Sequence, residues 1–219
     1  MKFEGIVLSE IDYKEASKIV NLYTEKGKIG VKALGSKKIK NGLLGFTTTG
    51  NTVSFVTTDK EVYTLIEYDI IDSIMKHDLD INEMKGLGVI LYIINIIPAD
   101  SPHDKIYPFV KDIISNIKNI NIDKLLSIFL IKMLYPFGIS PNLKSCVKCQ
   151  NNHDLIAFDI AYGGALCKNC IDKNDNIEIW NEYYYGKKNL KDYSDTDFSI
   201  LLNQIKNYYS YHLNIRLKL

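Results

Sequence analysis

All four cysteines of the 219-residue chain lie in one short segment, and their spacing is that of a metal site. Two residues separate Cys146 from Cys149 and Cys167 from Cys170, and seventeen residues lie between the pairs. One tight turn can present both thiols of a pair to the same ion, and two such pairs complete the tetrahedron typical of structural zinc. The spacing therefore predicts one structural Zn²⁺ per chain, in a knuckle at 144–172.

Other uses of four thiols fit this pattern less well. Two disulfides would suit a secreted chain, but the opening Met-Lys-Phe-Glu does not resemble a secretion signal. Iron–sulfur ligation stays open, because residue type alone does not separate it from zinc. Four thiolates leave no free coordination position, which argues against catalytic zinc. We expect His153, between the pairs, to be an exposed loop residue.

A second chemical feature is a run of lysines near the N-terminus. Residues 26–40 contain six lysines and no acid, although the whole chain has a net charge of only +1. The six are Lys26, Lys28, Lys32, Lys37, Lys38 and Lys40. Basic residues on a barrel surface are typical of contact with a nucleic-acid backbone, so we predict that these six bind nucleic acid. Arg216 is the only arginine, so the expected contacts are lysine charges on phosphates.

Lysines on a solvent-facing surface often serve only solubility, and the run is open to that interpretation too. Tyr23, Phe46 and Phe55 lie close enough in sequence to stack on bases, although each of them alone fits a core position better. No phosphate-binding glycine loop, serine nucleophile elbow or His-Glu-x-x-His motif is present. We therefore expect a binding protein without catalytic residues, not an enzyme.

The elements that must position these residues change type along the chain. β-rich segments with short turns predict five strands, at 3–11, 19–24, 29–34, 52–58 and 62–66. Apolar residues at helical spacing then predict helices at 82–97, 105–118 and 123–135, and a last helix capped by Ser194 or Asp195. The fold class is α+β, with a small barrel at 1–75 and a helical domain at 76–219. Strand number alone does not separate an OB-fold barrel from an SH3-like one.

Several short motifs, in their order, extend this interpretation. They are Tyr-Lys-Glu-Ala-Ser at 13–17, Leu-Tyr-Thr-Glu-Lys-Gly-Lys-Ile at 22–29, Ala-Leu-Gly-Ser-Lys-Lys at 33–38, Leu-Tyr-Pro-Phe-Gly-Ile-Ser-Pro at 134–141, and the two cysteine pairs. Together they resemble the RecO family of bacterial DNA-repair proteins and recombination mediators. The resemblance covers essentially the whole chain.

The resemblance implies a five-stranded OB-fold barrel packed on a helical domain that carries the zinc knuckle. It also implies binding to single- and double-stranded DNA and annealing of complementary strands. The partners would be RecR, the C-terminal tail of single-strand-binding protein and, indirectly, RecA. By position, Lys37, Lys38 and Lys40 match the basic barrel loop, and the four cysteines match the metal ligands.

Two other hypotheses remain. A barrel with a zinc knuckle would equally suit an RNA-binding protein, which would recognise the 2′-hydroxyl. The other is a metal-dependent enzyme whose site the motifs do not reveal. The longest apolar stretch, at 87–94, is too short to cross a bilayer. We therefore expect no membrane contact and a cytoplasmic, nucleoid-associated protein of bacterial type.

Overall fold

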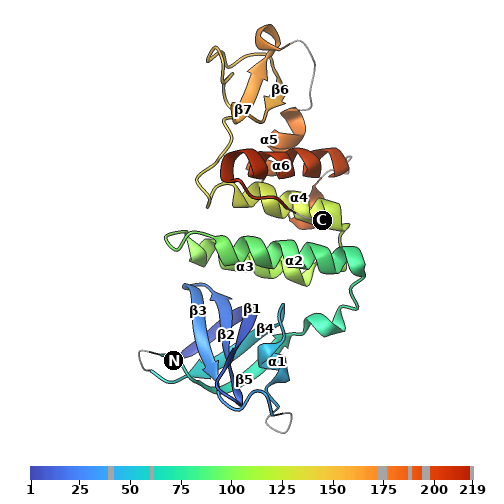
Figure 1. Cartoon of the computed structure of the whole chain (residues 1–219). Coiled ribbons are helices and arrows are strands. Elements are labelled where there is room, and N and C mark those ends of the chain that lie inside the picture. The colour runs from blue at the N-terminus through green and yellow to red at the C-terminus, as the bar shows by residue number, and fades with distance from the viewer. Residues whose placement is uncertain (39–41, 60–61, 172–176, 187–188, 194–197, 218–219) are drawn as a thin grey trace. The chain divides into compact units, whose positions relative to one another are not determined.

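The computed structural model divides the chain into two units, Met1–Asn119 and Ile120–Leu219. It describes all residues except 39–41, 60–61, 172–176, 187–188, 194–197 and 218–219 (Figure 1). The first unit contains a five-stranded sheet and two long helices, and the second is mainly helical with a small hairpin. The expected α+β class is confirmed. Among the described residues, no helix has the length and apolar character needed to cross a membrane.

The sheet of the first unit is antiparallel and has the strand order β3-β2-β1-β4-β5. Its strands are β1 (Lys2–Tyr13), β2 (Ser17–Thr24), β3 (Gly27–Ala33), β4 (Thr52–Thr57) and β5 (Leu65–Asp72). One parallel bridge, Lys32 to Thr64, joins the edge strand β3 to the segment that leads into β5. This is the strand order of a partly open OB-fold barrel, with the short helix α1 (Leu44–Thr47) between β3 and β4.

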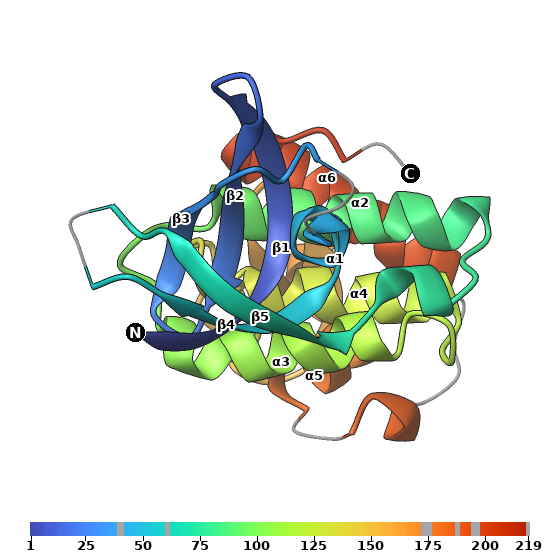
Figure 2. The ribbon, with the colours of Figure 1, turned by 90° about the horizontal axis from the view of Figure 1, so that it is seen from below.

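The barrel core comes from inward-facing residues of β1, β2, β3 and β4 and from Phe46 of α1. Its buried members are Phe3, Val7, Val20, Leu22, Val31, Ala33, Phe46, Val53 and Phe55. Successive side chains of a strand point to opposite faces, so the intervening residues of β1, β2 and β3 point outward. Figure 2 shows these three strands side by side.

Helices α2 (Ile81–Ile96) and α3 (His103–Ser115) pack on the barrel within the first unit. A capping box formed by Asp80 and Glu83 starts α2, and Pro98 follows its end. At the start of α3, His103 Nδ1 lies 3.1 Å from the hydroxyl oxygen of the buried Tyr23 of β2. The hydroxyl of Tyr107 donates to Glu4 of β1 across 2.9 Å.

The second unit places a hairpin beside three helices. Its elements are α4 (Ile122–Met133), β6 (Leu155–Asp159), β7 (Gly164–Cys167), α5 (Ile177–Tyr185) and α6 (Phe198–Leu213). The buried Tyr209 of α6 donates its hydroxyl hydrogen to the Leu130 carbonyl of α4 across 2.9 Å. Burial also raises the pKa of the Tyr209 phenol well above its ordinary value, so it keeps this proton.

Most of the expected elements are present, with shifted ends. The fifth strand occupies Leu65–Asp72 and not 62–66, while α5 and the β6–β7 hairpin were not predicted. The expected cap at Ser194 or Asp195 lies outside the described residues. By packing, the boundary between the units falls after Asn119, because α2 and α3 contact the barrel. The domain boundary expected at 75/76 stays a prediction.

Candidate metal centre and nucleic-acid interface

The four cysteines meet beside the β6–β7 hairpin. Their Sγ atoms all lie within 4.8 Å of one another, and those of Cys149 and Cys167 are 3.5 Å apart. Four sulfurs at about 2.3 Å from one tetrahedral ion lie about 3.8 Å from each other. The cluster can therefore hold one four-coordinate metal ion, as the spacing of the two pairs predicts.

Backbone geometry brings the two pairs of thiols together. The Cys146 N–H donates to the Asn151 carbonyl across 2.7 Å, and Gln150 N–H donates to the Cys146 carbonyl across 2.9 Å, which closes the first turn. Gln150 has a φ of 63°, in the left-handed region that a tight turn needs. Cys167 ends β7, and Cys170 lies in the 3₁₀ turn that follows it.

The same backbone favours a thiolate at one ligand. Burial opposes ionisation of Cys146, but hydrogen bonds from the backbone of Cys167, Cys149 and Lys148 lower the pKa of its thiol to about 6. Side-chain hydrogen bonds with Cys149 and Cys167 raise the pKa of the Cys170 thiol to about 12. Because a cation favours thiolates at every ligand, metal binding at this site is coupled to proton release.

Aromatic stacking fixes the hairpin to the helices of the second unit. Phe158 of β6 stacks on Trp180 of α5 with ring centroids 3.8 Å apart and planes 10° apart. Both rings contact Tyr208 of α6, and His212 Nε2 lies 2.7 Å from the Ile160 carbonyl oxygen. Cys146 and Cys167 pack with Ala157 and Leu166 of the same hairpin, so the four-cysteine cluster is connected to this packing. His153 is exposed and lies outside the cluster, as expected.

The lysines predicted to bind DNA lie at two ends of the barrel. Lys28 donates from Nζ to the carbonyls of Asn95 and Ile97, at 2.7 and 3.1 Å, and so holds the end of α2. Lys26 lies at the β2–β3 turn with Nζ 5.6 Å from the centroid of the Phe3 ring. Lys40 lies outside the described residues.

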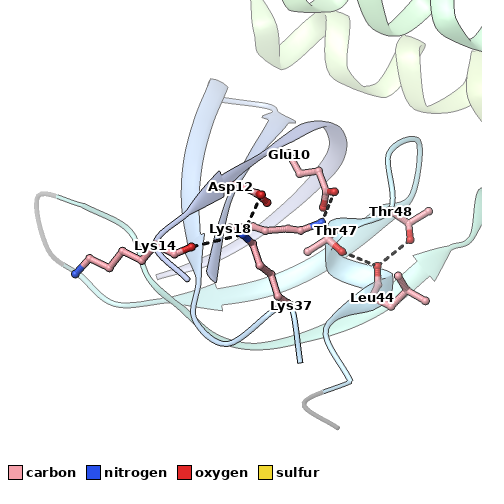
Figure 3. Close-up of polar contacts among 8 residues, drawn as sticks. All are labelled: Glu10, Asp12, Lys14, Lys18, Lys37, Leu44, Thr47 and Thr48. Carbon is pink, nitrogen blue, oxygen red and sulfur yellow. Dashed lines mark hydrogen bonds and ion pairs between the residues drawn. The ribbon is translucent and has the colours of Figure 1, made fainter. Parts of the chain in front are cut away.

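The remaining predicted lysines lie near the opposite end, where the β1–β2 turn meets the loop after β3. Backbone N–H of Lys37 donates to the Ala16 carbonyl across 3.2 Å, which joins the two loops. Figure 3 shows that this brings Lys18 near Lys37, and that Lys37 Nζ contacts the backbone carbonyl of Lys14, whose own side chain extends away from it. We define the basic end of the barrel as Lys14, Lys18, Lys32, Lys37 and Lys38.

Acidic partners hold two of these ammonium groups in place. Lys37 Nζ is 2.9 Å from Asp12 Oδ2, and Lys18 forms an ion pair with Glu10. Asp12, Lys18 and Lys37, together with Leu44 and other residues, line a pocket of about 440 Å³. An exposed ion pair of this kind is worth at most about 1 kcal/mol. A phosphate can therefore replace Asp12 at Lys37 at little cost.

The aromatic residues considered for base stacking are in the core. Tyr23, Phe46 and Phe55 are each no more than 1% exposed, so their core interpretation is correct. The structure instead brings Tyr13 to the basic end. Its ring centroid lies 5.1 Å from Lys32 Nζ and 5.4 Å from Lys14 Nζ.

Sequence reasoning missed Tyr13, Lys14 and Lys18 because they precede the lysine run. Tyr13 pairs with Ser17 across a tight turn, and Lys18 pairs with Ala33 next to the loop of Lys37. The turn expected between the strands at 3–11 and 19–24 could have indicated that these residues lie near the loop of Lys37. In an OB fold the β1–β2 loop and the face of strands 2 and 3 are the usual binding region.

Comparisons with known proteins cover both units. The family model described as Recombination protein O N terminal matches residues 1–74, and Recombination protein O C terminal matches residues 80–219. The DNA repair protein RecO of Halalkalibacterium halodurans is 31% identical over 182 residues, which cover 79% of this chain and 70% of the relative. DNA repair protein RecO of Bacillus subtilis is 30% identical over 182 residues, with coverages of 79% and 69%.

Proposed function

Because the chain belongs to the recombination protein O family, whose role is in DNA repair and recombination, we propose that it is a recombination mediator. In this proposal it binds single- and double-stranded DNA and anneals complementary strands. It also acts with RecR to load RecA on DNA coated with single-strand-binding protein. Such work takes place on the chromosome, at the nucleoid. It requires no covalent chemistry from this chain.

The basic end of the barrel is the observation that carries the proposal. Lysines from two loops gather there, and Lys37 and Lys38 are exposed. Lysine acts on phosphate as a point charge and reads no sequence, which suits a protein that must act on any DNA. Binding that depends on counterion release also weakens as salt rises, so the annealed product can be released.

We propose zinc for the four-cysteine cluster, in a structural role. Four thiolates complete its tetrahedral coordination and leave no position for a substrate. The stack of Phe158 on Trp180 supports this role, because it couples the order of the cluster to the packing of α5 and α6. Metal analysis of the purified protein separates zinc from an iron–sulfur cluster.

DNA is favoured over RNA as the ligand, since the matching relatives are DNA repair proteins. The basic-end proposal predicts the effect of a double variant, Lys37→Ala with Lys38→Ala. If each lysine contacts one phosphate, the slope of log affinity against log salt for single strands falls by about 1.4. The matched control is Lys85→Ala with Lys105→Ala, which removes two exposed lysines from α2 and α3.

The deciding experiment is annealing of two complementary oligonucleotides, each coated with the cognate single-strand-binding protein. We expect the chain to accelerate annealing, and the acceleration to disappear when the acidic tail of the coating protein is removed. The Lys37 and Lys38 double variant should anneal slowly, while the control pair stays close to wild type. If folded, metal-loaded protein gives no acceleration, the mediator proposal is wrong.

A further inference from the structure

The four sulfurs of the cysteine cluster differ in their access to solvent. Cys146 and Cys167 are at most 1% exposed, and both pack with Ala157 in a small apolar core. Cys170 is half-buried, whereas Cys149 is the one exposed cysteine of the chain. Because the reactivity of a cysteine depends on its accessibility, a reagent dissolved in water attacks Cys149 first.

The exposed sulfur touches a buried sulfur of the other cysteine pair. Cys149 Sγ lies 3.5 Å from Cys167 Sγ, and Cys167 is the last residue of β7. Two sulfurs at this distance form a covalent bond after approaching each other by about 1.5 Å. A Cys149 sulfur that has been oxidised therefore has a second cysteine in contact with which it can react.

We propose that Cys149 is a site of oxidation by hydroperoxides and that the product is a disulfide between Cys149 and Cys167. This inference rests on the zinc proposed for the cluster, which keeps all four cysteines as thiolates. It adds a second role to the cluster, because two of the ligands that hold the metal are also the groups that react.

The oxidation takes two steps. The Cys149 thiolate attacks one oxygen of hydrogen peroxide, the O–O bond breaks, and the products are a sulfenic acid and hydroxide. The Cys167 thiolate then attacks the Cys149 sulfur, the S–O bond breaks, and a second hydroxide leaves as the disulfide forms. The two thiolates together lose two electrons, which the peroxide accepts, and two protons from the buffer convert the hydroxides to water.

The disulfide removes two of the four ligands from the metal. Cys146 and Cys170 alone do not complete the tetrahedral set of four ligands that a structural zinc requires. Since metal binding and folding are coupled at such a site, the zinc leaves and the β6–β7 hairpin loosens. The first unit contains no cysteine, so the modification acts on the second unit.

The single tryptophan of the chain reports on the packing of this hairpin. Trp180 of α5 is fully buried and stacks on Phe158 of β6, with ring centroids 3.8 Å apart. Its indole N–H donates to Gln204 Oε1 across 2.8 Å. Figure 1 shows the hairpin next to α5 within the second unit. Loosening of the hairpin therefore exposes Trp180 to water and shifts its fluorescence emission to longer wavelength.

The test treats zinc-loaded protein with hydrogen peroxide and follows zinc release to a chromogenic chelator together with the emission of Trp180. Mass spectrometry identifies the first oxidised cysteine, after trapping of its sulfenic acid with dimedone, and maps the disulfide. The variants are Cys149→His and, as the matched control, Cys170→His. Histidine is a zinc ligand too, so each variant loses one thiol and keeps four ligands. The zinc content of each variant is measured before oxidation.

We expect the dimedone adduct on Cys149 and, without the trap, a disulfide between Cys149 and Cys167. Zinc release and the shift of Trp180 emission should proceed at the rate at which the disulfide forms. Cys149→His should release zinc about tenfold more slowly than wild type, because oxidation follows exposure, while Cys170→His should stay close to the wild-type rate. Dithiothreitol with added zinc should restore the emission, because thiol–disulfide exchange reverses the modification.

Two results would overturn the inference. One is a first adduct on another cysteine, or a disulfide within a pair, Cys146 to Cys149 or Cys167 to Cys170. The other is zinc release from Cys149→His at the wild-type rate. The mapping needs only the wild-type protein, so it decides the question even if a variant takes up no zinc. Failure of the zinc proposal is separate: the untreated protein then contains no zinc, and the mapping still tests Cys149.

Discussion

Replacing Asp12 with asparagine should tighten the binding of DNA, although most changes in a binding surface weaken it. Asp12 Oδ2 lies 2.9 Å from Lys37 Nζ and so competes with phosphate for this ammonium group. The substitution Asp12→Asn keeps the shape of the side chain and removes the charge. Lys37 is then free to pair with DNA, and the repulsion between Asp12 and the phosphate disappears.

The size of the effect follows from the geometry of the exposed pair. The Asp12 side chain is 73% exposed, so water screens its field. A phosphate at Lys37 would lie about 6 Å from the Asp12 carboxylate, where the repulsion in water is about 0.7 kcal/mol. Loss of this repulsion strengthens the binding of DNA about threefold at low salt. Because salt screens this repulsion, the slope of log affinity against log salt for single strands should become steeper, although no phosphate contact is added.

Fluorescence anisotropy of a labelled single strand, titrated from 50 to 400 mM salt (about 14 to 5 Å of screening length), measures both quantities. The matched control is Asp69→Asn, which changes the net charge equally on exposed β5. Asp12→Asn should exceed the control at low salt, and the two should converge at high salt. Equal effects of both variants, or none from Asp12→Asn, would refute the role of Lys37 in phosphate contact.

Two further predictions concern the framework of the two units. Cys146→Ser should abolish stable zinc binding and lower the melting temperature, because binding free energy on the order of 10 kcal/mol is coupled to folding of such a site. Metal analysis and thermal unfolding measure this, with the exposed His153→Ala as a control that keeps its metal; full zinc content in Cys146→Ser would contradict the ligand assignment. Lys28→Met should lower the free energy of unfolding by about 1 kcal/mol, because it removes two hydrogen bonds to carbonyls at the end of α2. Its effect on single-strand affinity should be smaller than that of Lys37→Met, and an equal loss would show that Lys28 contacts DNA as the lysine run first suggested.

The four-cysteine cluster could be predicted from the sequence because the geometry of each cysteine pair is local. Two residues between the thiols of each pair suffice to bring them to one ion, whatever the rest of the fold does. Four of the five barrel strands were also predictable, since β-rich segments between short turns mark them, whereas the fifth was expected too early, at 62–66. The hairpin that carries Cys167 was not, because its short β6 is stabilised by the stack of Phe158 on Trp180 and not by its own pattern.

The nucleic-acid surface depends on pairings between distant residues, and composition could locate it only in part. The lysine run indicated the sign of the charge, but the run divides over two ends of the barrel once β2 and β3 pair. Lys28 binds carbonyls at the end of α2, whereas Lys18, outside the run, lines one pocket with Lys37 and Lys38.

Residue type and spacing by themselves determined the four-cysteine site, the barrel strands and a positive N-terminal region. Only the tertiary structure decided which lysines gather and which aromatic ring lies beside them, since strand register sets the face on which each side chain points. Tyr23, Phe46 and Phe55 share the chemistry of Tyr13, yet their positions in the ladder and in α1 bury them. Spacing along a chain is a local property, whereas a surface is defined by contacts across strands.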